Sequence, residues 1–72
     1  MIIKKNDEFI NQNNQLVRIT GKHFSDYAVD VFEYNDDSEN YDIYDSSTIY
    51  TAGEIRRIAG AKDITWIEDN ED

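Results

Sequence analysis

The sequence predicts a mainly β fold: a small antiparallel sheet, or a closed barrel, of about five strands with one short helix before the last strand. Three observations lead to this prediction. Ten Ile stand against one Leu, and β-branched residues, which pack well on a pleated sheet, occupy 17 of the 72 positions. Proline is absent, which removes one obstacle to continuous strand ladders. Short apolar segments also alternate with turn-forming clusters along most of the chain.

The first 26 residues predict two short apolar pairs, one longer strand and two connections. Ile2–Ile3 and Phe9–Ile10 are the apolar pairs. Residues 11–14, with the sequence NQNN, are expected to turn, because Asn tolerates positive φ and bonds to nearby backbone groups. Residues 15–20 alternate between apolar and polar side chains, which predicts a strand with one buried face. Residues 21–26 are expected to form a loop.

The segment 27–34 gives the clearest strand pattern in the chain. Val29 and Val31 fall on one face of this strand, whereas Phe32 and Tyr34 fall on the opposite face. Either both faces are partly covered, or a bulge shifts the alternation. Both alternatives stay open at the level of the sequence.

A hairpin turn is predicted directly after this strand. Residues 35–40 read NDDSEN, and Asn, Asp and Ser are residues that β-turns favour. Residues 41–45 alternate again and are expected to form the second arm. The predicted hairpin therefore spans residues 27–45.

One helix is predicted near the C-terminus. Thr51 and Glu54 have the spacing of a capping box, in which each side chain accepts a hydrogen bond from a backbone amide of the first turn. A helix is then expected over Ala52–Ala59, with Gly60 suited to the left-handed residue that follows its end. Residues 64–67 predict a last strand. The expected core is Ile10, Val17, Ile19, Val29, Val31, Ile43, Ile49, Ile55, Ile58, Ile64 and Trp66.

A chain of 72 residues has room for one small domain. We expect this β-rich domain to span residues 1–67 and an acidic flexible tail to span residues 68–72. The order of the elements is similar to that of SH3-like small barrels, in which a short helical turn precedes the final strand. The resemblance covers most of the chain and rests on the pattern of elements. It implies a barrel but no particular function, because small barrels host many functions.

The composition excludes several classes of protein. Sixteen acidic against seven basic residues give a net charge of −9, which disfavours direct binding to nucleic-acid phosphates. The absence of cysteine excludes disulfides, zinc–thiolate sites and thiol catalysis. No apolar run approaches the roughly 18 residues of a membrane span, and no signal-peptide core is present. We therefore expect a cytoplasmic protein that does not bind membranes.

The residues that catalysis or metal binding would need are scarce, and we expect neither enzyme activity nor a cofactor or metal. His23 is the only histidine, and Ser46–Ser47–Thr48 lacks the context of a nucleophile elbow. An EF-hand calcium loop that began at Asp36 would need Gly at position 41 and Glu at position 47. The sequence has Tyr41 and Ser47 there, so an ordinary turn is the favoured interpretation.

The acidic charge is concentrated in one stretch. Residues 1–22 carry a net charge of +2 and residues 56–72 of −2, whereas residues 23–55 contain nine acids and no Lys or Arg. In a hairpin over 27–45, carboxylates two residues apart would lie about 6.6 Å apart on one face, a spacing of the same order as that of nucleic-acid phosphates. The tyrosines of the chain interleave with these acids and offer flat contact surface. The predicted partner-binding residues are Asp30, Glu33, Tyr34, Asp36, Asp37, Glu39, Asp42 and Tyr44.

Two functional hypotheses follow. In the first, the protein is a small acidic binding protein that mimics nucleic acid and inhibits a basic DNA- or RNA-binding protein through its acidic, Tyr-rich hairpin. Its size and charge resemble those of anti-restriction and anti-CRISPR proteins of phages and mobile elements. In the second, the protein is an adaptor that binds a protein segment through a strand edge, and its charge serves only solubility. Either protein is expected to be a monomer or a weak homodimer.

Overall fold

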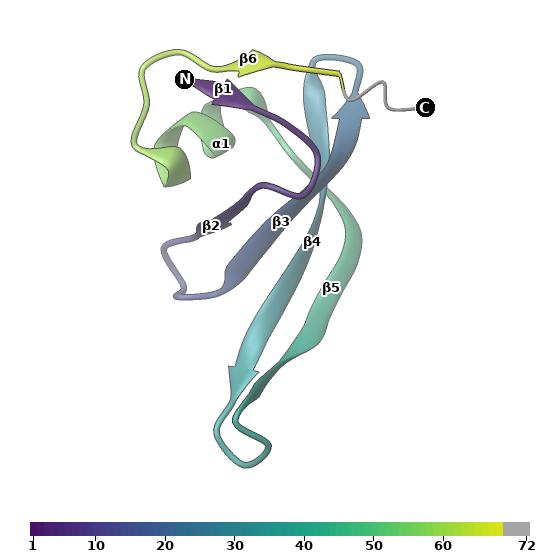
Figure 1. The fold of residues 1–72 in the computed structure, drawn as a ribbon, viewed down its shortest axis with the longest axis vertical. Coiled ribbons are helices and arrows are strands. Elements are labelled where there is room, and N and C mark those ends of the chain that lie inside the picture. The colour runs from purple at the N-terminus through teal and green to yellow at the C-terminus, as the bar shows by residue number, and fades with distance from the viewer. Residues whose placement is uncertain (69–72) are drawn as a thin grey trace.

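The computed structural model describes residues 1–68 and contains six strands and one helix among them (Figure 1). β2, β3, β4 and β5 form an antiparallel sheet in that order, and β1 and β6 form a separate parallel pair. Residues 69–72, which belong to the predicted tail, lie outside the described residues. The elements are β1 (Ile2–Ile3), β2 (Glu8–Ile10), β3 (Leu16–His23), β4 (Asp26–Asn35), β5 (Asn40–Tyr50), α1 (Ala52–Ala59) and β6 (Thr65–Trp66).

The mainly β prediction, an antiparallel sheet with one short helix, is confirmed, but the barrel alternative is wrong. Within residues 1–68 the sheet stays open, because β2 and β5 each have a hydrogen-bonded neighbour on one side only. The chain after α1 pairs with β1 instead of returning to the sheet: the Thr65 N–H donates to the Met1 carbonyl (2.8 Å) and the Ile67 N–H to the Ile3 carbonyl (2.9 Å). No local pattern encodes this pairing between the two ends of the chain.

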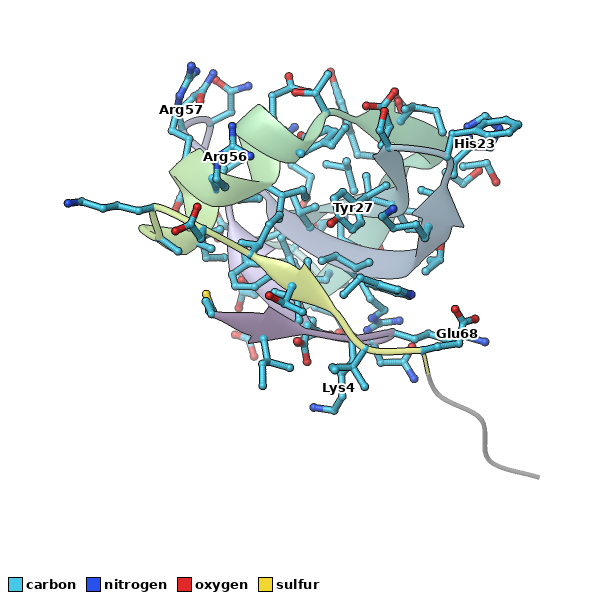
Figure 2. The ribbon with its side chains drawn as sticks, turned by 90° about the horizontal axis from the view of Figure 1, so that it is seen from above. Lys4, His23, Tyr27, Arg56, Arg57 and Glu68 are labelled. Atoms are coloured by element: carbon cyan, nitrogen blue, oxygen red, sulfur yellow. The ribbon has the colours of Figure 1, made fainter. Side chains whose placement is uncertain are left out.

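One face of the sheet, which we call the inner face, carries the core. β3 contributes Val17 and Ile19, and β4 contributes Tyr27, Val29 and Val31, all of them buried. The alternation predicted for these two strands is confirmed. Two residues from outside the sheet complete the core, Ile3 of β1 and Ile55 of α1, and α1 and the β1–β6 pair therefore lie over the inner face (Figures 1 and 2).

Three predicted core residues belong to the opposite, outer face. Ile10, Ile43 and Ile49 are 46%, 55% and 44% exposed. In the ladder Ile10 lies opposite Leu16, Ile43 opposite Phe32 and Ile49 opposite Ala28. Each of these three partners is next in sequence to an inner-face residue, so the partners and the three Ile lie on the outer face. These three predictions are wrong because the position in the ladder decides which face an Ile occupies. Conversely, Ile3, which the predicted core omits, is fully buried. The predicted core residues Ile58, Ile64 and Trp66 are partly buried against the core.

Bulges set which residues of β5 face inward. Val31 lies opposite Asp45 and Phe32 opposite Ile43, so Tyr44 is an extra residue without a partner. A second irregularity follows near Ser47, whose φ is 57°. β4 itself keeps its alternation, and Phe32 and Tyr34 lie on the outer face, where Phe32 is partly buried. The alternative of a bulge in the segment 27–34 is therefore wrong, and the bulges of this strand pair lie in β5.

The predicted loop at residues 21–26 is a tight turn between two long strands. β3 continues to His23 and β4 begins at Asp26, which leaves only Phe24 and Ser25 between them. An irregularity in the β3–β4 register at Thr20 precedes this extension. His23 is exposed, as expected for a turn histidine, and packs edge-on against Phe24 with 4.9 Å between ring centroids.

The helix forms where the sequence predicts it. The Glu54 N–H donates to Thr51 Oγ1 (3.1 Å), and the Thr51 N–H donates to Glu54 Oε1 (2.8 Å), which completes the capping box. Gly60 ends the helix in the left-handed conformation, with φ 68°. Among the described residues no helix is long and apolar enough to cross a membrane.

Replacement of Ile55 by Ala tests the packing of α1 on the sheet. Ile55 is fully buried, so the substitution is expected to lower the free energy of unfolding by about 2–5 kcal/mol. A domain of this size has roughly 3–5 kcal/mol in total, so a large fraction of the variant is expected to be unfolded. Urea denaturation followed by circular dichroism measures the change. The control, Ile43→Ala on the exposed face, is expected to change stability by less than about 1 kcal/mol, and an equal loss in both variants would contradict this assignment of the core.

Phe24 is expected to strain the β3–β4 turn. Its φ is 58° and its side chain is 86% exposed, so an unfavourable backbone conformation is not offset by burial. Phe24→Asn is expected to raise the free energy of unfolding by about 1 kcal/mol, because Asn adopts this conformation readily. Phe24→Ala, which also removes the ring but keeps the strain, is the matched control. Equal urea midpoints for the two variants would show that the turn is not strained at this position.

Candidate functional site

The far end of the β4–β5 hairpin extends beyond the core. Val31 is the last buried residue of β4, and every residue from 33 to 47 except Asn35 is exposed. This end of the ribbon lies opposite the end that carries α1 and β1 (Figure 1). We call residues 33–42 the acidic hairpin, because they contain Glu33, Asp36, Asp37, Glu39 and Asp42 and no Lys, Arg or His.

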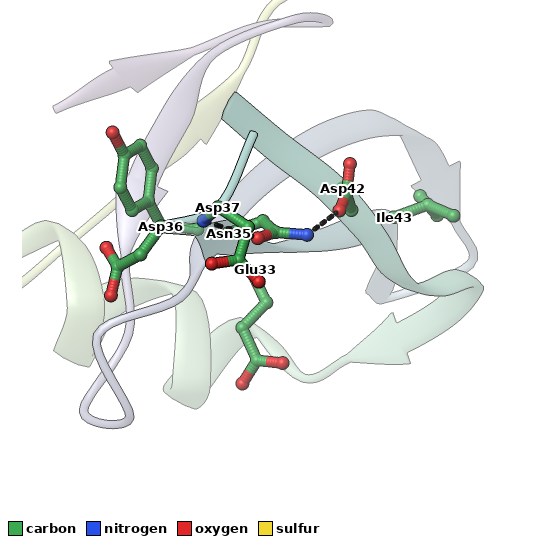
Figure 3. Close-up of a pocket in the computed structure, with 7 residues that line it drawn as sticks. Glu33, Asn35, Asp36, Asp37, Asp42 and Ile43 are labelled. Carbon is green, nitrogen blue, oxygen red and sulfur yellow. Dashed lines mark hydrogen bonds between the residues drawn. The ribbon is translucent and has the colours of Figure 1, made fainter. Parts of the chain in front are cut away.

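Asn35 organises the turn of the acidic hairpin. The backbone N–H groups of Asp37 and Ser38 donate to Asn35 Oδ1 (2.9 and 3.4 Å), and Asn35 Nδ2 donates to Asp42 Oδ2 (2.9 Å; Figure 3). Glu39 closes the turn with φ 56°. The sequence reasoning missed the role of Asn35. Its signal is the Asn-Asp-Asp start of the turn, because Asn at this position commonly bonds to the backbone two residues on.

Two acidic residues occupy opposed positions in the ladder of the ribbon. Glu33 and Asp42 are direct cross-strand partners on the inner face, where Cβ atoms of such pairs lie about 4.5–5.5 Å apart. Gln15 Nε2 approaches Glu33 Oε2 at 3.5 Å. Glu33 and Asp42, together with Asp36 and Asp37 of the turn, border an open depression of about 420 Å³. The depression is lined by Glu33, Tyr34, Asn35, Asp36, Asp37, Asp42 and Ile43 (Figure 3).

No cation of the described chain neutralises the acidic hairpin. The ion pairs found within residues 1–68 are Lys4–Asp7 (3.5 Å) and Arg18–Glu8 (2.9 Å), and neither involves this hairpin. Lys4, Arg56 and Arg57 project from the opposite end of the molecule, which Figure 2 shows from above. Across the same residues, no three His, Asp or Glu side chains converge as a metal site would require. The carboxylates are therefore presented to solvent as a local negative field.

The structure brings five of the eight predicted partner-binding residues to the depression and leaves three apart. Asp30 lies on the outer face of β4 opposite Arg18, and its Oδ1 accepts a hydrogen bond from the Ser47 N–H (2.9 Å). Glu39 lies in the turn, and Tyr44 is the exposed extra residue of β5. Because Asp30 faces outward and Glu33 inward, the carboxylates form no continuous ladder with two-residue steps on one face.

The aromatic surface is smaller than the sequence predicts. Tyr27 is a core residue, and Tyr50 is half-buried and accepts a hydrogen bond from Asn11 Nδ2 (3.2 Å). Tyr34 and Tyr41 pack against each other on the outer face with 5.3 Å between ring centroids. Only these two tyrosines and Tyr44 flank the acids with exposed rings.

Comparison of the chain with protein-family models, with curated proteins and with solved structures gives no match.

Glu33→Gln is expected to stabilise the fold. The substitution removes one of two negative charges at opposed ladder positions and keeps a side chain of the same shape, so the free energy of unfolding is expected to rise by roughly 0.2–1 kcal/mol. The gain is expected to shrink between about 0.05 M and about 0.5 M NaCl, because salt screens exposed charges. Urea denaturation at both salt concentrations measures it. Glu68→Gln changes the net charge equally at a distant site, and a gain of the same size there would show that the effect is one of total charge.

Proposed function

We propose that the protein is a binding protein without enzyme activity, and that its acidic hairpin occupies a cationic nucleic-acid-binding groove of another protein. The observation that carries this proposal is a protruding, hydrogen-bonded ribbon whose carboxylates have no cationic partner among residues 1–68. Such a ribbon presents charge in the manner of a nucleic-acid backbone, at fixed positions and on a narrow support.

The dimensions of the hairpin support this role. From Val31 to Asn35 the ribbon extends about 14 Å beyond the last buried residue of β4, at about 3.4 Å per residue. Its two strands are about 4.8 Å apart, and the molecule measures 37 × 31 × 17 Å. The ribbon is thus thin enough to enter a groove that admits a nucleic-acid strand. The acids lie on the inner face and in the turn, so the end of the ribbon carries charge on more than one side.

Preorganisation of its backbone supports the hairpin as the binding surface. The Asn35 bonds and the cross-strand ladder hold the hairpin backbone, and the Asp42 carboxylate accepts a hydrogen bond from Asn35 Nδ2, so binding orders few additional backbone groups. A concentrated negative field also accelerates encounter with a cationic partner, and this acceleration falls steeply as ionic strength rises. Complexes formed through the acidic hairpin are therefore expected to be sensitive to salt.

A second candidate function rests on the free edge of β5. This strand pairs with β4 alone within the described chain, and residues 40–47 are all exposed. An open edge of this length can accept an extended segment of a partner as an additional strand. In this adaptor the backbone of β5 makes the main contacts, so substitutions that neutralise the acids of the hairpin would leave binding intact.

Two variants with the same net charge test the site. The hairpin variant carries Glu33→Gln, Asp36→Asn, Asp37→Asn, Glu39→Gln and Asp42→Asn. The control neutralises five acids near the C-terminus, with Asp63→Asn, Glu68→Gln, Asp69→Asn, Glu71→Gln and Asp72→Asn. The readout is capture of proteins from a lysate of the source cells or their host at about 0.1 M and about 0.5 M NaCl, with identification by mass spectrometry. Asp30 is left intact because it bonds to the backbone of β5.

We expect the native protein and the C-terminal control to retain DNA- or RNA-binding proteins at low salt. Added nucleic acid should displace these proteins, and the hairpin variant should lose them. Equal loss in both variants would show a nonspecific charge effect and contradict the proposal. A partner that withstands raised salt and binds the hairpin variant would favour the strand-edge adaptor instead.

A further inference from the structure

The outer face of the sheet carries a row of apolar side chains that crosses all four strands. Ile10 of β2 lies opposite Leu16 of β3, Leu16 opposite Phe32 of β4, and Phe32 opposite Ile43 of β5. Directly opposed residues share a face, and Leu16 and Phe32 each adjoin a buried inner-face valine in sequence. Tyr34 and Tyr41 form the next row toward the turn. We call Ile10, Leu16, Phe32, Tyr34, Tyr41 and Ile43 the outer patch.

No other element of the described chain covers the outer patch. Ile3, Ile55 and Trp66 pack against the inner-face residues, so β1, α1 and β6 all lie on the other side of the sheet. Tyr34 and Tyr41 are 48% and 43% exposed, and the two Ile of the patch are exposed to a similar degree. Only the Arg18 guanidinium lies over part of it, 4.9 Å from the centre of the Phe32 ring.

The size of the outer patch fits weak association. A fully buried aromatic side chain contributes 150–250 Å², so the two half-exposed tyrosines offer about 100 Å² each and the whole patch roughly 400 Å². This area lies within the roughly 300–600 Å² of the largest apolar patch on a typical monomer, and such patches are often functional. It is also below the roughly 800 Å² per partner of a standard stable interface. An occupant of this patch alone is therefore expected to bind reversibly.

The charges beside the outer patch bear on which partner can cover it. The strand residues that adjoin the patch on the side of the core are Glu8, Arg18 and Asp30, and Arg18 pairs with Glu8 at 2.9 Å. These three residues give a net charge of −1 on the core side of the patch. At its other end, Tyr34 and Ile43 border the depression that Glu33, Asp36, Asp37 and Asp42 also line. Glu33 and Asp42 point to the inner face. Of the faces of the sheet, the outer face is thus the one on which two like-charged copies can approach with the least repulsion.

Pairing of two copies through the β5 edges is less favourable. Such pairing would bring Asp42 and Asp45 of the two copies together, and the bulges at Tyr44 and near Ser47 interrupt the edge. Both features are known to block edge-to-edge association of sheets. Face-to-face packing avoids this repulsion, because it places the two sheets about 10 Å apart with their apolar rows in contact.

We propose that the outer patch is the interface of a reversible homodimer, in which the sheets of two copies pack face to face. The contact is isologous, so the row from Ile10 to Ile43 meets the same row of the second copy. The inner-face and turn acids stay exposed in this dimer, whereas Tyr34 becomes a dimer contact. This inference does not depend on the proposed function.

Sedimentation equilibrium of the native protein tests the proposal. Between about 10 μM and about 1 mM, the weight-average mass is expected to rise from 8.4 kDa toward twice that value. Raised salt is expected to shift the rise to lower protein concentration, because salt screens the repulsion between the copies and leaves the apolar contact intact. This salt dependence is opposite to that expected for a complex formed by the acidic hairpin, so the two proposals can fail separately.

Ile43→Asp and Ile10→Asp place a charge at either end of the row, and both are expected to abolish the rise in mass while circular dichroism stays native. Phe24→Asp is the matched control, because it exchanges an exposed apolar side chain for the same charge away from the patch. It should dimerise as the native protein does. Amide resonances that shift on dilution are expected at the outer patch. A mass of 8.4 kDa at every concentration, or dimerisation that the two patch variants retain, would overturn the proposal.

Discussion

The single apolar layer between the sheet and α1 is the constraint on which the rest of the molecule depends. The inner-face residues of β3 and β4 meet Ile55 and Ile3, and together these few side chains form the buried core. Within residues 1–68 no element covers the second face of the sheet, and the part of the β4–β5 ribbon beyond Val31 is exposed on both sides. Carboxylates are tolerated there because they remain in water, where a charge has no desolvation cost.

Beyond this layer the β4–β5 ribbon is stabilised by contacts between its own residues. Asn35 supports the turn with three hydrogen bonds, and the Tyr34 and Tyr41 rings pack against each other on the outer face. Glu33 and Asp42 place two like charges at opposed positions of the same ladder, an arrangement that generally destabilises a strand pair.

The sequence predicts those parts of this fold that depend on local rules. The helix follows from the Thr51–Glu54 capping box, and the buried faces of β3 and β4 follow from alternation. The exposed Ile10, Ile43 and Ile49 could not be recognised, because an apolar residue on a strand fits either face and bulges set the register. The open sheet could not be recognised either, since it depends on the pairing of β1 with β6 across the whole chain. For the candidate site, composition locates the charge in residues 23–55. It does not show that Asp30 lies on the opposite face from Glu33, which only the ladder decides.

The two proposed surfaces share one ribbon, and the two-residue period of a strand separates them. Along β5, Tyr41 and Ile43 face outward, while Asp42 between them faces inward beside Glu33. A shift of the β4–β5 register by one residue would move the acids among the apolar rows and expose the apolar residues among the acids. The extra residue Tyr44 keeps Asp45 opposite Val31 while Ile43 stays opposite Phe32. Through this bulge the part of β5 that packs on the core and the part that carries the acids each keep their own register. The bulge is thus the local feature that allows a sheet with a one-sided core to present an acidic face and an apolar face at its free end.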